Sequence, residues 1–234
     1  MEQMLSISDL SVWYNKGTNI LDRVSFTIES NKATGLLGVN GAGKTTLINY
    51  LSSVHKHYEG TIQYEGKNIR VNDTVFKLSR YTVFTEEQAF GYWSFEDYVN
   101  FIHKTYKRSV DWAVINSLTQ GFGFEQYKSY KIKDLSTGNK KKVFLITGFA
   151  LRLPLLILDE PLDGLDFSSS EYLYKAINEY KEFGGILMSS HIAESFEKTC
   201  DAILLLQKGK ITAKSFSGGM NIRSELAGWL HEND

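Results

Sequence analysis

The chain has 234 residues, with 26 basic and 27 acidic side chains, so its formal net charge is -1. This length is enough to bury the core of one large domain or of a domain with an added lobe, and the balanced charge argues against a general nucleic-acid-binding protein. The single cysteine, Cys200, excludes an internal disulfide, and no apolar run approaches the roughly 20 residues of a membrane-spanning helix. We therefore expect a soluble, cytoplasmic protein without a signal peptide.

Apolar and polar side chains alternate in the N-terminal part of the chain, which predicts β-strands. Residues 5–12 and 20–28 follow this pattern, and residues 33–39 are a short apolar segment that runs into glycines, as a buried strand does before a functional turn. The next elements that we expect are a helix over residues 45–53 and short strands over residues 60–64 and near Ile69.

Residues 86–151 differ in character, because aromatic and basic side chains recur there at helical spacings. We expect a mostly helical insert over this range. The continuous apolar run Leu153–Leu158 is typical of a central strand in a parallel sheet. The remaining elements that we expect are a helix over residues 167–183, a strand over 185–189, a helix over 192–199 and a hairpin over 202–213. Strands that alternate with helices indicate an α/β fold with a parallel sheet.

A glycine-rich loop follows the apolar segment at residues 33–39 and precedes a helix. Its sequence matches the pattern G-x-x-x-x-G-K-[ST], in which backbone N–H groups and the helix N-terminus surround a phosphate. A chance glycine-rich turn is the alternative, but the strand and the helix around it favour the functional interpretation. We expect the Lys44 ammonium at the β- and γ-phosphates, the Thr45 hydroxyl on Mg²⁺ and Thr46 near the α-phosphate. The predicted phosphate-binding residues are Gly38, Asn40, Gly41, Ala42, Gly43, Lys44, Thr45 and Thr46.

Two adjacent acids, Asp159 and Glu160, follow the apolar run Leu153–Leu158. Carboxylates at the end of a buried strand are costly to desolvate unless a cation or a proton compensates them. Beside a phosphate-binding loop, Asp159 is predicted to bind Mg²⁺ and Glu160 to act as the general base for an attacking water. An ordinary acidic turn is the alternative. His191 follows the strand at 185–189, at a sheet edge where ligands bind, and is a candidate sensor of the γ-phosphate.

The segment Leu135–Asn139 resembles LSGGQ, the signature of the ATP-binding subunits of ABC transporters. Together with the phosphate loop and the two acids, it makes the chain resemble that family from about Leu5 to Ala213. The resemblance implies that the signature contacts the ATP held by a second subunit, through Ser136, Thr137, Gly138 and Asn139. In the alternative interpretation, Ser136 is simply the N-cap of a helix; the two interpretations are compatible.

Other positions of the family pattern can be placed on this sequence. Tyr14 corresponds to the aromatic ring that stacks on adenine, with Trp13 as its competitor and a core position as the alternative. Asp166 corresponds to the acid of the D-loop, which crosses the dimer interface, and His191 to the switch histidine. Glu86 stands where the family has a glutamine that ligates Mg²⁺, and Gln88 is the alternative for that role.

The resemblance implies a P-loop NTPase core with a mainly parallel sheet, an N-terminal antiparallel β region and an inserted helical subdomain. We expect one ATP-binding domain over residues 1–213, divided into a core lobe (1–85 and 152–213) and a helical subdomain (about 86–151). A short tail would occupy residues 214–234. The implied ligands are ATP and Mg²⁺.

The implied activity is ATP hydrolysis that drives a membrane permease at the cytoplasmic face of the membrane. The partners would be that permease, docked near Glu86 to Phe95, and a second ATP-binding subunit, identical or related, without nucleic acid. Thr137 and Asn139 depart from the signature, and Glu86 departs from the family's glutamine. Variants of this kind resemble the subunits of bacterial exporters with separate permeases, so export of a peptide, antibiotic or drug-like substrate is expected. The alternatives are a soluble ATPase acting on DNA or ribosomes, and a nucleotide-gated interaction module.

Two clusters of side chains carry further expectations. The aromatic residues Phe90, Tyr92, Trp93 and Phe95 suit a groove that receives a helix of the permease, or else they fill the core of the helical subdomain. The three lysines at 140–142 are expected on a solvated helix face rather than in a binding patch.

Overall fold

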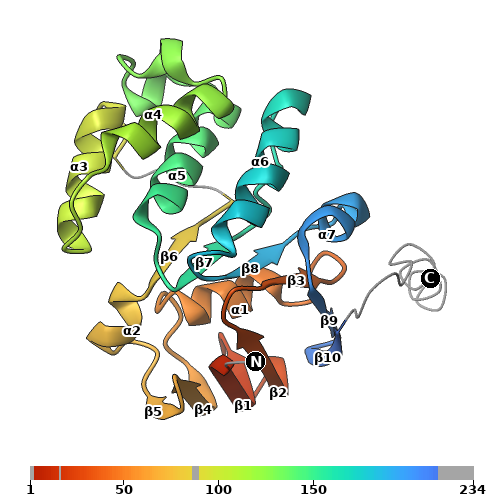
Figure 1. Ribbon diagram of the computed structural model, residues 1–234. Helices are drawn as coiled ribbons and strands as arrows, with labels where there is room; N and C mark the ends of the chain where they lie inside the picture. The colour runs from red at the N-terminus through yellow and green to blue at the C-terminus, as the bar shows by residue number, and fades with distance from the viewer. Residues whose placement is uncertain (1–2, 16, 86–89, 216–234) are drawn as a thin grey trace.

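The computed structural model describes residues 3–15, 17–85 and 90–215 (Figure 1). The N-terminal part forms a four-stranded antiparallel sheet in the order β2-β1-β4-β5. In its register, Ile7 of β1 lies opposite Phe26 of β2 and Ile62 of β4, so apolar side chains from three strands share one face. The strands are β1 (Gln3–Trp13), β2 (Asn19–Glu29), β4 (Tyr58–Tyr64) and β5 (Lys67–Ile69).

The second sheet has six strands in the order β10-β9-β3-β8-β7-β6. All neighbouring pairs are parallel except β9 and β10, which form the C-terminal hairpin. The strands are β3 (Ala33–Leu37), β6 (Arg80–Val83), β7 (Leu155–Leu158), β8 (Gly185–Ser189), β9 (Ala202–Gln207) and β10 (Lys210–Ser215). The predicted α/β fold, with an antiparallel N-terminal region and a mainly parallel sheet, is confirmed.

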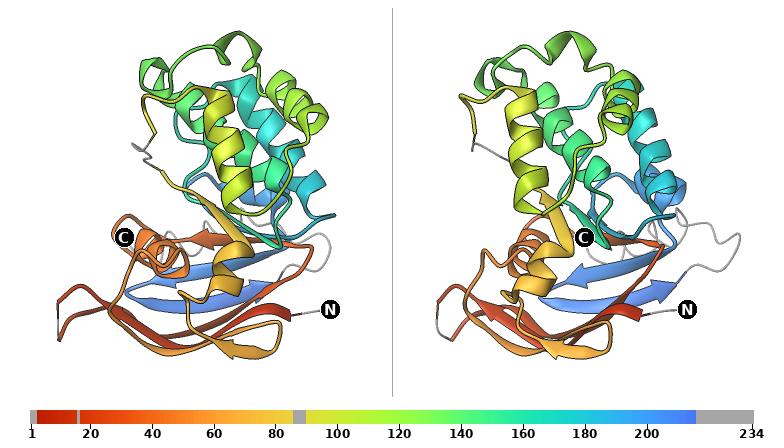
Figure 2. Two further views of the ribbon diagram at one scale, coloured as in Figure 1. Left: turned by 90° about the vertical axis from the view of Figure 1, so that its left-hand side faces the viewer. Right: turned by 60° about the vertical axis from the view of Figure 1, so that its left-hand side comes forward.

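Helices gather at the end of the molecule opposite the N-terminal sheet, where α3, α4 and α5 lie together (Figures 1 and 2). Several of them begin at a side chain that accepts a hydrogen bond from the first turn, as Ser94 does for α3 and Asp111 for α4. The helices are α1 (Lys44–Leu51), α2 (Thr74–Leu78), α3 (Phe95–Thr105), α4 (Trp112–Gly121), α5 (Thr137–Leu151), α6 (Phe167–Tyr180) and α7 (Ala193–Thr199), with short 3₁₀ turns at Glu125–Tyr127 and Ile132–Asp134.

The six-stranded sheet separates two hydrophobic cores. On β7, Leu155 and Ile157 belong to the core that includes α1 and the antiparallel sheet, whereas Leu156 and Leu158 belong to the core beneath the helices. This alternation follows from the period of two in a strand, and it explains why β7 is apolar at every position. The buried sheet is a rigid base for the loops at its edge.

The lobe boundaries at residues 85 and 152 remain predictions, and most of the expected tail lies outside the described residues. Two elements, α2 and β6, were not expected from the sequence. Among the described residues, no helix combines the length and the apolar character needed to cross a membrane.

Candidate functional site

The carboxyl ends of three neighbouring parallel strands meet at one edge of the six-stranded sheet. β3 pairs with β8, and β8 pairs with β7, all in the same direction. The glycine-rich loop follows β3, the acids Asp159 and Glu160 follow β7, and His191 follows β8. Segments far apart in the sequence therefore lie side by side, at the edge where α/β sheets bind ligands.

The glycine-rich loop adopts a backbone that glycine permits. Gly41 and Gly43 have φ values of 81° and 110°, in the left-handed region that other residues avoid. Gly38 is packed so closely that a Cβ there would lie 2.6 Å from the carbonyl oxygen of Leu206. The loop leads directly into α1, whose N-terminal backbone N–H groups are a favourable place for an anion.

Lys44, the first residue of α1, reaches back over this loop. Its side chain is largely buried, and its ammonium donates a hydrogen bond to the carbonyl oxygen of Gly38 at 2.7 Å. The same nitrogen lies 3.7 Å from Oε1 of Glu160. The predicted phosphate-binding lysine and the predicted general base are thus brought together.

A serine connects the two acids. The Ser189 hydroxyl donates to Oδ1 of Asp159 at 2.7 Å and accepts a hydrogen bond from the backbone N–H of Glu160 at 2.9 Å. Asp159 is 2% exposed, so its charge depends on such donors. Glu160 has a φ of 44°, an unfavourable value for a residue other than glycine, and such values are common at functional sites. Sequence analysis missed Ser189, whose only sequence signal is its position at the end of β8.

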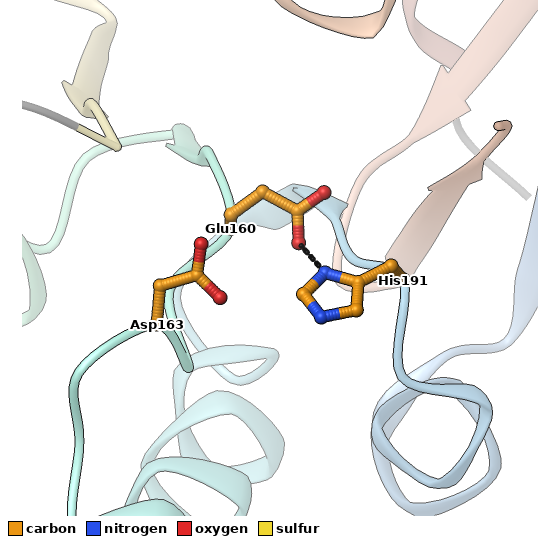
Figure 3. A group of neighbouring side chains, drawn as sticks. All are labelled: Glu160, Asp163 and His191. Atoms are coloured by element: carbon orange, nitrogen blue, oxygen red, sulfur yellow. Dashed lines mark hydrogen bonds and ion pairs between the residues drawn. The ribbon is translucent and has the colours of Figure 1, made fainter. Parts of the chain in front are cut away.

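His191 meets Glu160 on the side away from Lys44. Its Nδ1 lies 3.0 Å from Oε2 of Glu160, and Asp163 is close by (Figure 3). The imidazole is 59% exposed, in contrast to Glu160, which is 15% exposed. A mostly buried carboxylate with one oxygen toward a lysine and the other toward an accessible histidine is suited to accept and pass on a proton.

Tyr14 stands at the rim of this site. Its ring is 54% exposed and meets the His55 ring edge-on at a centroid distance of 4.6 Å. Its hydroxyl is 3.5 Å from Oγ1 of Thr46, which ties it to α1. Trp13, the alternative, contributes its backbone carbonyl to a hydrogen bond with His55. The exposed face of Tyr14 leaves the predicted adenine-stacking role open to experiment.

The signature residues form a second group. Ser136 caps α5 by accepting a hydrogen bond from the backbone N–H of Asn139 at 3.3 Å. Gly138 packs against the carbonyl oxygen of Gly164, in the D-loop, so closely that no side chain fits there. The described residues around this contact line a cavity of about 420 Å³, which includes Ser136, Gly138, Asn139, Lys142, Gly164 and Asp166.

Asp166, in the predicted D-loop (residues 163–166), forms an ion pair with α5, the helix that begins at the signature. Its carboxylate caps α6 by accepting from the backbone N–H of Ser169 and forms an ion pair with Lys142 at 2.9 Å. The hydrogen bond from Ser169 and the nearby Lys142 ammonium lower the pKa of Asp166 well below its usual range.

The expectation of a solvated face at residues 140–142 is wrong for two of the three lysines. Lys141 and Lys142 are 4% and 5% exposed, because α5 is packed between the sheet and the other helices. The Lys141 ammonium lies near the backbone carbonyl of Glu160, and burial lowers its pKa. Its nearest acids are those of the site: Asp163, Asp159 and Glu160.

Within the described part of the chain, no hydrogen bond or ion pair joins the side chains of Ser136 or Asn139 to Lys44 or Glu160. Among the described residues, direct polar contacts therefore do not join these side chains of the two predicted groups. Glu86 and Gln88, the candidates for the Q-loop position, lie outside the described residues.

A groove of about 490 Å³ lies beside the predicted permease-docking segment, between β6, α2 and α3. Phe90 and Tyr98 line it, together with Arg80. Phe95 is not available to a partner, because it is 1% exposed and packs against Phe124. The aromatic residues are thus shared between the groove and the core, and docking of a permease helix in this groove remains a prediction.

The residues at the sheet edge fit a nucleotide with its cation. The loop offers two closely packed glycines, Gly38 and Gly43, together with a lysine ammonium and the hydroxyls of Thr45 and Thr46. Asp159 and Glu160 follow β7 at the same edge of the sheet. A strand, a phosphate loop and a helix, with acids at the end of another parallel strand of the same sheet, define a P-loop nucleoside triphosphatase.

Comparison with known proteins narrows this class. Residues 21–163 match the family model described as ABC transporter. The chain is 40% identical over 214 residues to the putative ABC transporter ATP-binding protein AlbC of Bacillus subtilis, covering 89% of this chain and 90% of that protein. It is 32% identical over 211 residues to the tungstate uptake system ATP-binding protein TupC of Peptoclostridium acidaminophilum, covering 88% and 96%.

A comparison with solved structures supports the same assignment. A structure of an ATP-binding subunit of an ABC transporter superposes with a TM-score of 0.84 at 26% identity, covering 97% of this chain and 99% of that one. The chain belongs to the ABC transporter family, as an ATP-binding subunit. Members of this family hydrolyse ATP to power transport.

Proposed function

We propose that Glu160 is the general base of ATP hydrolysis in this subunit and that His191 assists it. The observation that carries this proposal is the position of the Glu160 carboxylate, with Oε1 3.7 Å from the Lys44 ammonium and Oε2 3.0 Å from Nδ1 of His191. A general base for ATP hydrolysis must lie close to the phosphate-binding lysine, because the attacking water is there. It also needs a neighbouring group that stabilises the charge formed when it accepts the proton. This arrangement supplies both.

Phosphate binding is assigned to the loop from Gly38 to Thr46, and adenine stacking to Tyr14. Thr45 and Asp159, with Glu86, would hold Mg²⁺, which neutralises phosphate charge when bound. Ser189 orients Asp159 and fixes the backbone of Glu160 through its two hydrogen bonds. Lys44 places its charge where the transferred phosphate would lie.

The test is the Glu160→Gln substitution, which keeps the size of the side chain but removes its basicity. We expect the steady-state rate of ATP hydrolysis to fall by roughly a hundredfold or more, while ATP still binds, as measured by calorimetry. Glu182→Gln, on the loop after α6, is the matched control and should hydrolyse ATP like the wild type. A Glu160→Gln protein with a wild-type rate would remove Glu160 from this role. Lys44→Ala, by contrast, should weaken ATP binding itself.

The subunit is further proposed to dimerise around two ATP·Mg, with Ser136, Thr137, Gly138 and Asn139 of one copy meeting the nucleotide of the other. Asp166 would lie at that interface. A permease would dock at the groove near Phe90 and hold the subunit at the cytoplasmic face of the membrane. Export is proposed because the departures at Thr137, Asn139 and Glu86 from the family pattern resemble those of exporter subunits.

Co-purification with the permease encoded beside this subunit would test the partner, and transport in membrane vesicles would test the direction. Substrate that accumulates on the side of the membrane bearing the subunit would contradict export. The identity to a tungstate uptake subunit does not decide the direction, because it extends over the shared ATP-binding domain.

A further inference from the structure

Three side chains that can ligate a metal converge beside the phosphate loop, and one of them, Asp163, has no role in the function proposed above. Glu160, Asp163 and His191 each offer one ligand atom, and these atoms all lie within 4.8 Å of one another. Figure 3 shows the two carboxylates and the imidazole turned toward the space between them. The three residues come from two segments, one after β7 and one after β8.

The backbone holds these side chains in place. The N–H of Asp163 donates to the carbonyl oxygen of Glu160 at 3.2 Å, which closes a tight turn and brings the two carboxylates to one side. Ser189 binds the backbone N–H of Glu160, and His191 follows Ser189 by two residues. A site whose ligands are already positioned loses less entropy when a metal binds.

The donor set favours a transition metal over Mg²⁺. One imidazole nitrogen and two carboxylates suit Zn²⁺, whereas Mg²⁺ prefers oxygen ligands and retained water. Zinc–ligand bonds of about 2.0–2.2 Å place neighbouring tetrahedral ligands about 3.4 Å apart. The ligand atoms lie within 4.8 Å of one another, so a zinc ion would have to draw them together by at most about 1.4 Å. Three protein ligands would leave a fourth coordination position for water.

Charge around the cluster also favours a cation. Oε2 of Glu160 faces His191, whereas Oε1 faces Lys44, so a metal on Oε2 leaves the lysine contact intact. The acids Asp159, Glu160 and Asp163 face the ammonium groups of Lys44 and Lys141. Three negative and two positive charges leave a net charge of -1 for a dication to meet.

We propose that Glu160, Asp163 and His191 form a binding site for Zn²⁺, and that zinc bound there inhibits ATP hydrolysis. Binding engages Oε2 of Glu160 and the ring nitrogen of His191, so neither can serve a proton transfer while the metal is present. The inhibition rests on the proposed role of Glu160 as general base. The binding itself does not.

Binding is tested on the nucleotide-free chain by calorimetric titration with ZnCl₂ in millimolar Mg²⁺. We expect one Zn²⁺ per chain, and loss of one of three ligands in Asp163→Asn should weaken the affinity by at least about tenfold. Asp163→Glu, which restores a carboxylate, should recover part of the loss. His57→Ala is the matched control, because His57 lies beside His55 and could form a competing site.

Co²⁺ provides a second measurement, because intense visible absorption bands report tetrahedral binding to nitrogen and oxygen ligands. Wild-type protein should show these bands, and Asp163→Asn should lose them while its thermal melting remains cooperative. Equal zinc affinity in wild type and Asp163→Asn, an affinity weaker than millimolar, or a loss of binding in His57→Ala would overturn the site.

Inhibition is measured separately, with free Zn²⁺ set by a metal buffer and each rate expressed relative to the zinc-free rate of the same protein. The half-inhibiting concentration should rise by about tenfold in Asp163→Asn, in step with the affinity. A wild-type protein that binds zinc but is not inhibited would overturn the inhibitory role. A wild type that hydrolyses no ATP would contradict the proposed function, and calorimetry would still decide the zinc site.

Discussion

The buried hydroxyl of Ser189 joins the two acids at the carboxyl edge of the six-stranded sheet. Ser189 is 0% exposed, and its two hydrogen bonds connect Asp159 to the backbone of Glu160. An alanine there would leave a buried carboxylate without this donor and a partly buried N–H without its acceptor. The buried carboxylate accounts for a cost of about 1–3 kcal/mol, because water can replace the acceptor of the partly buried N–H.

We expect Ser189→Ala to lower the free energy of unfolding by about 1–3 kcal/mol in urea titrations. The rate of ATP hydrolysis should fall by about tenfold, which corresponds to about 1.4 kcal/mol in the activation barrier. Ser195→Ala is the matched control, because Ser195 is equally buried and its hydroxyl donates to the carbonyl of Ile192, the N-cap of its own helix. If both variants hydrolyse ATP at the wild-type rate, Ser189 does not position the two acids.

At the scale of elements, the junction of α5 and α6 depends on one ion pair. Asp166 caps α6 and pairs with Lys142 of α5, which is nearly buried. Asp166→Asn keeps a good N-cap but removes the charge, so Lys142 loses its counter-ion. We expect the free energy of unfolding at pH 7 to fall by roughly 1 kcal/mol.

The same pair predicts a pH dependence. Since folding lowers the pKa of Asp166 below its usual value of 3.8, the folded state binds fewer protons than the unfolded state. The stabilisation is therefore fully present above about pH 4 and is lost as the pH falls through the lowered pKa. In urea titrations, the gap between wild type and Asp166→Asn should be smaller at pH 3 than at pH 7. A pH-independent gap, or additive effects of Asp166→Asn and Lys142→Met, would argue against the pairing.

Continuous motifs made much of this site predictable. The phosphate loop and the acids after β7 carry their chemistry within a few consecutive residues, so their positions at strand ends could be inferred. Ser189, Lys142 and Asp163 could not be assigned in this way, because their contacts come from neighbouring strands and helices. Strand β6 was missed because four residues, including the buried Arg80, show no clear alternation.

Burial also reversed one expectation at the level of elements. Three consecutive lysines on a helix predict a solvated face, yet α5 is buried on almost every side. Lys141 and Lys142 are accommodated because their ammonium groups reach acids or carbonyls at the ends of neighbouring strands and helices. Only the packing of the whole molecule determines which helix is enclosed in this way.

At the scale of the whole molecule, the phosphate site and the signature group are built on different elements. One lies at the carboxyl edge of β3, β7 and β8, and the other lies at the start of α5 beside the D-loop. Each group ends in exposed polar side chains, Thr45 in the first and Ser136 in the second. A nucleotide between two copies would join the phosphate site of one to the signature group of the other.

This geometry predicts a nucleotide-dependent change of mass. Glu160→Gln with ATP and Mg²⁺ should behave as a dimer, at twice the 26.6 kDa of the chain, because slow hydrolysis would preserve the γ-phosphate that is proposed to bridge the copies. Light scattering coupled to size exclusion measures the mass directly. Without ATP, or with Lys44→Ala added, the same protein should remain at 26.6 kDa, since the bridging ligand is absent or weakly bound.

Signature contacts are tested by Ser136→Ala in the Glu160→Gln background, which should weaken dimerisation while leaving ATP affinity of the monomer unchanged. A monomer in every condition would contradict assembly from two identical copies.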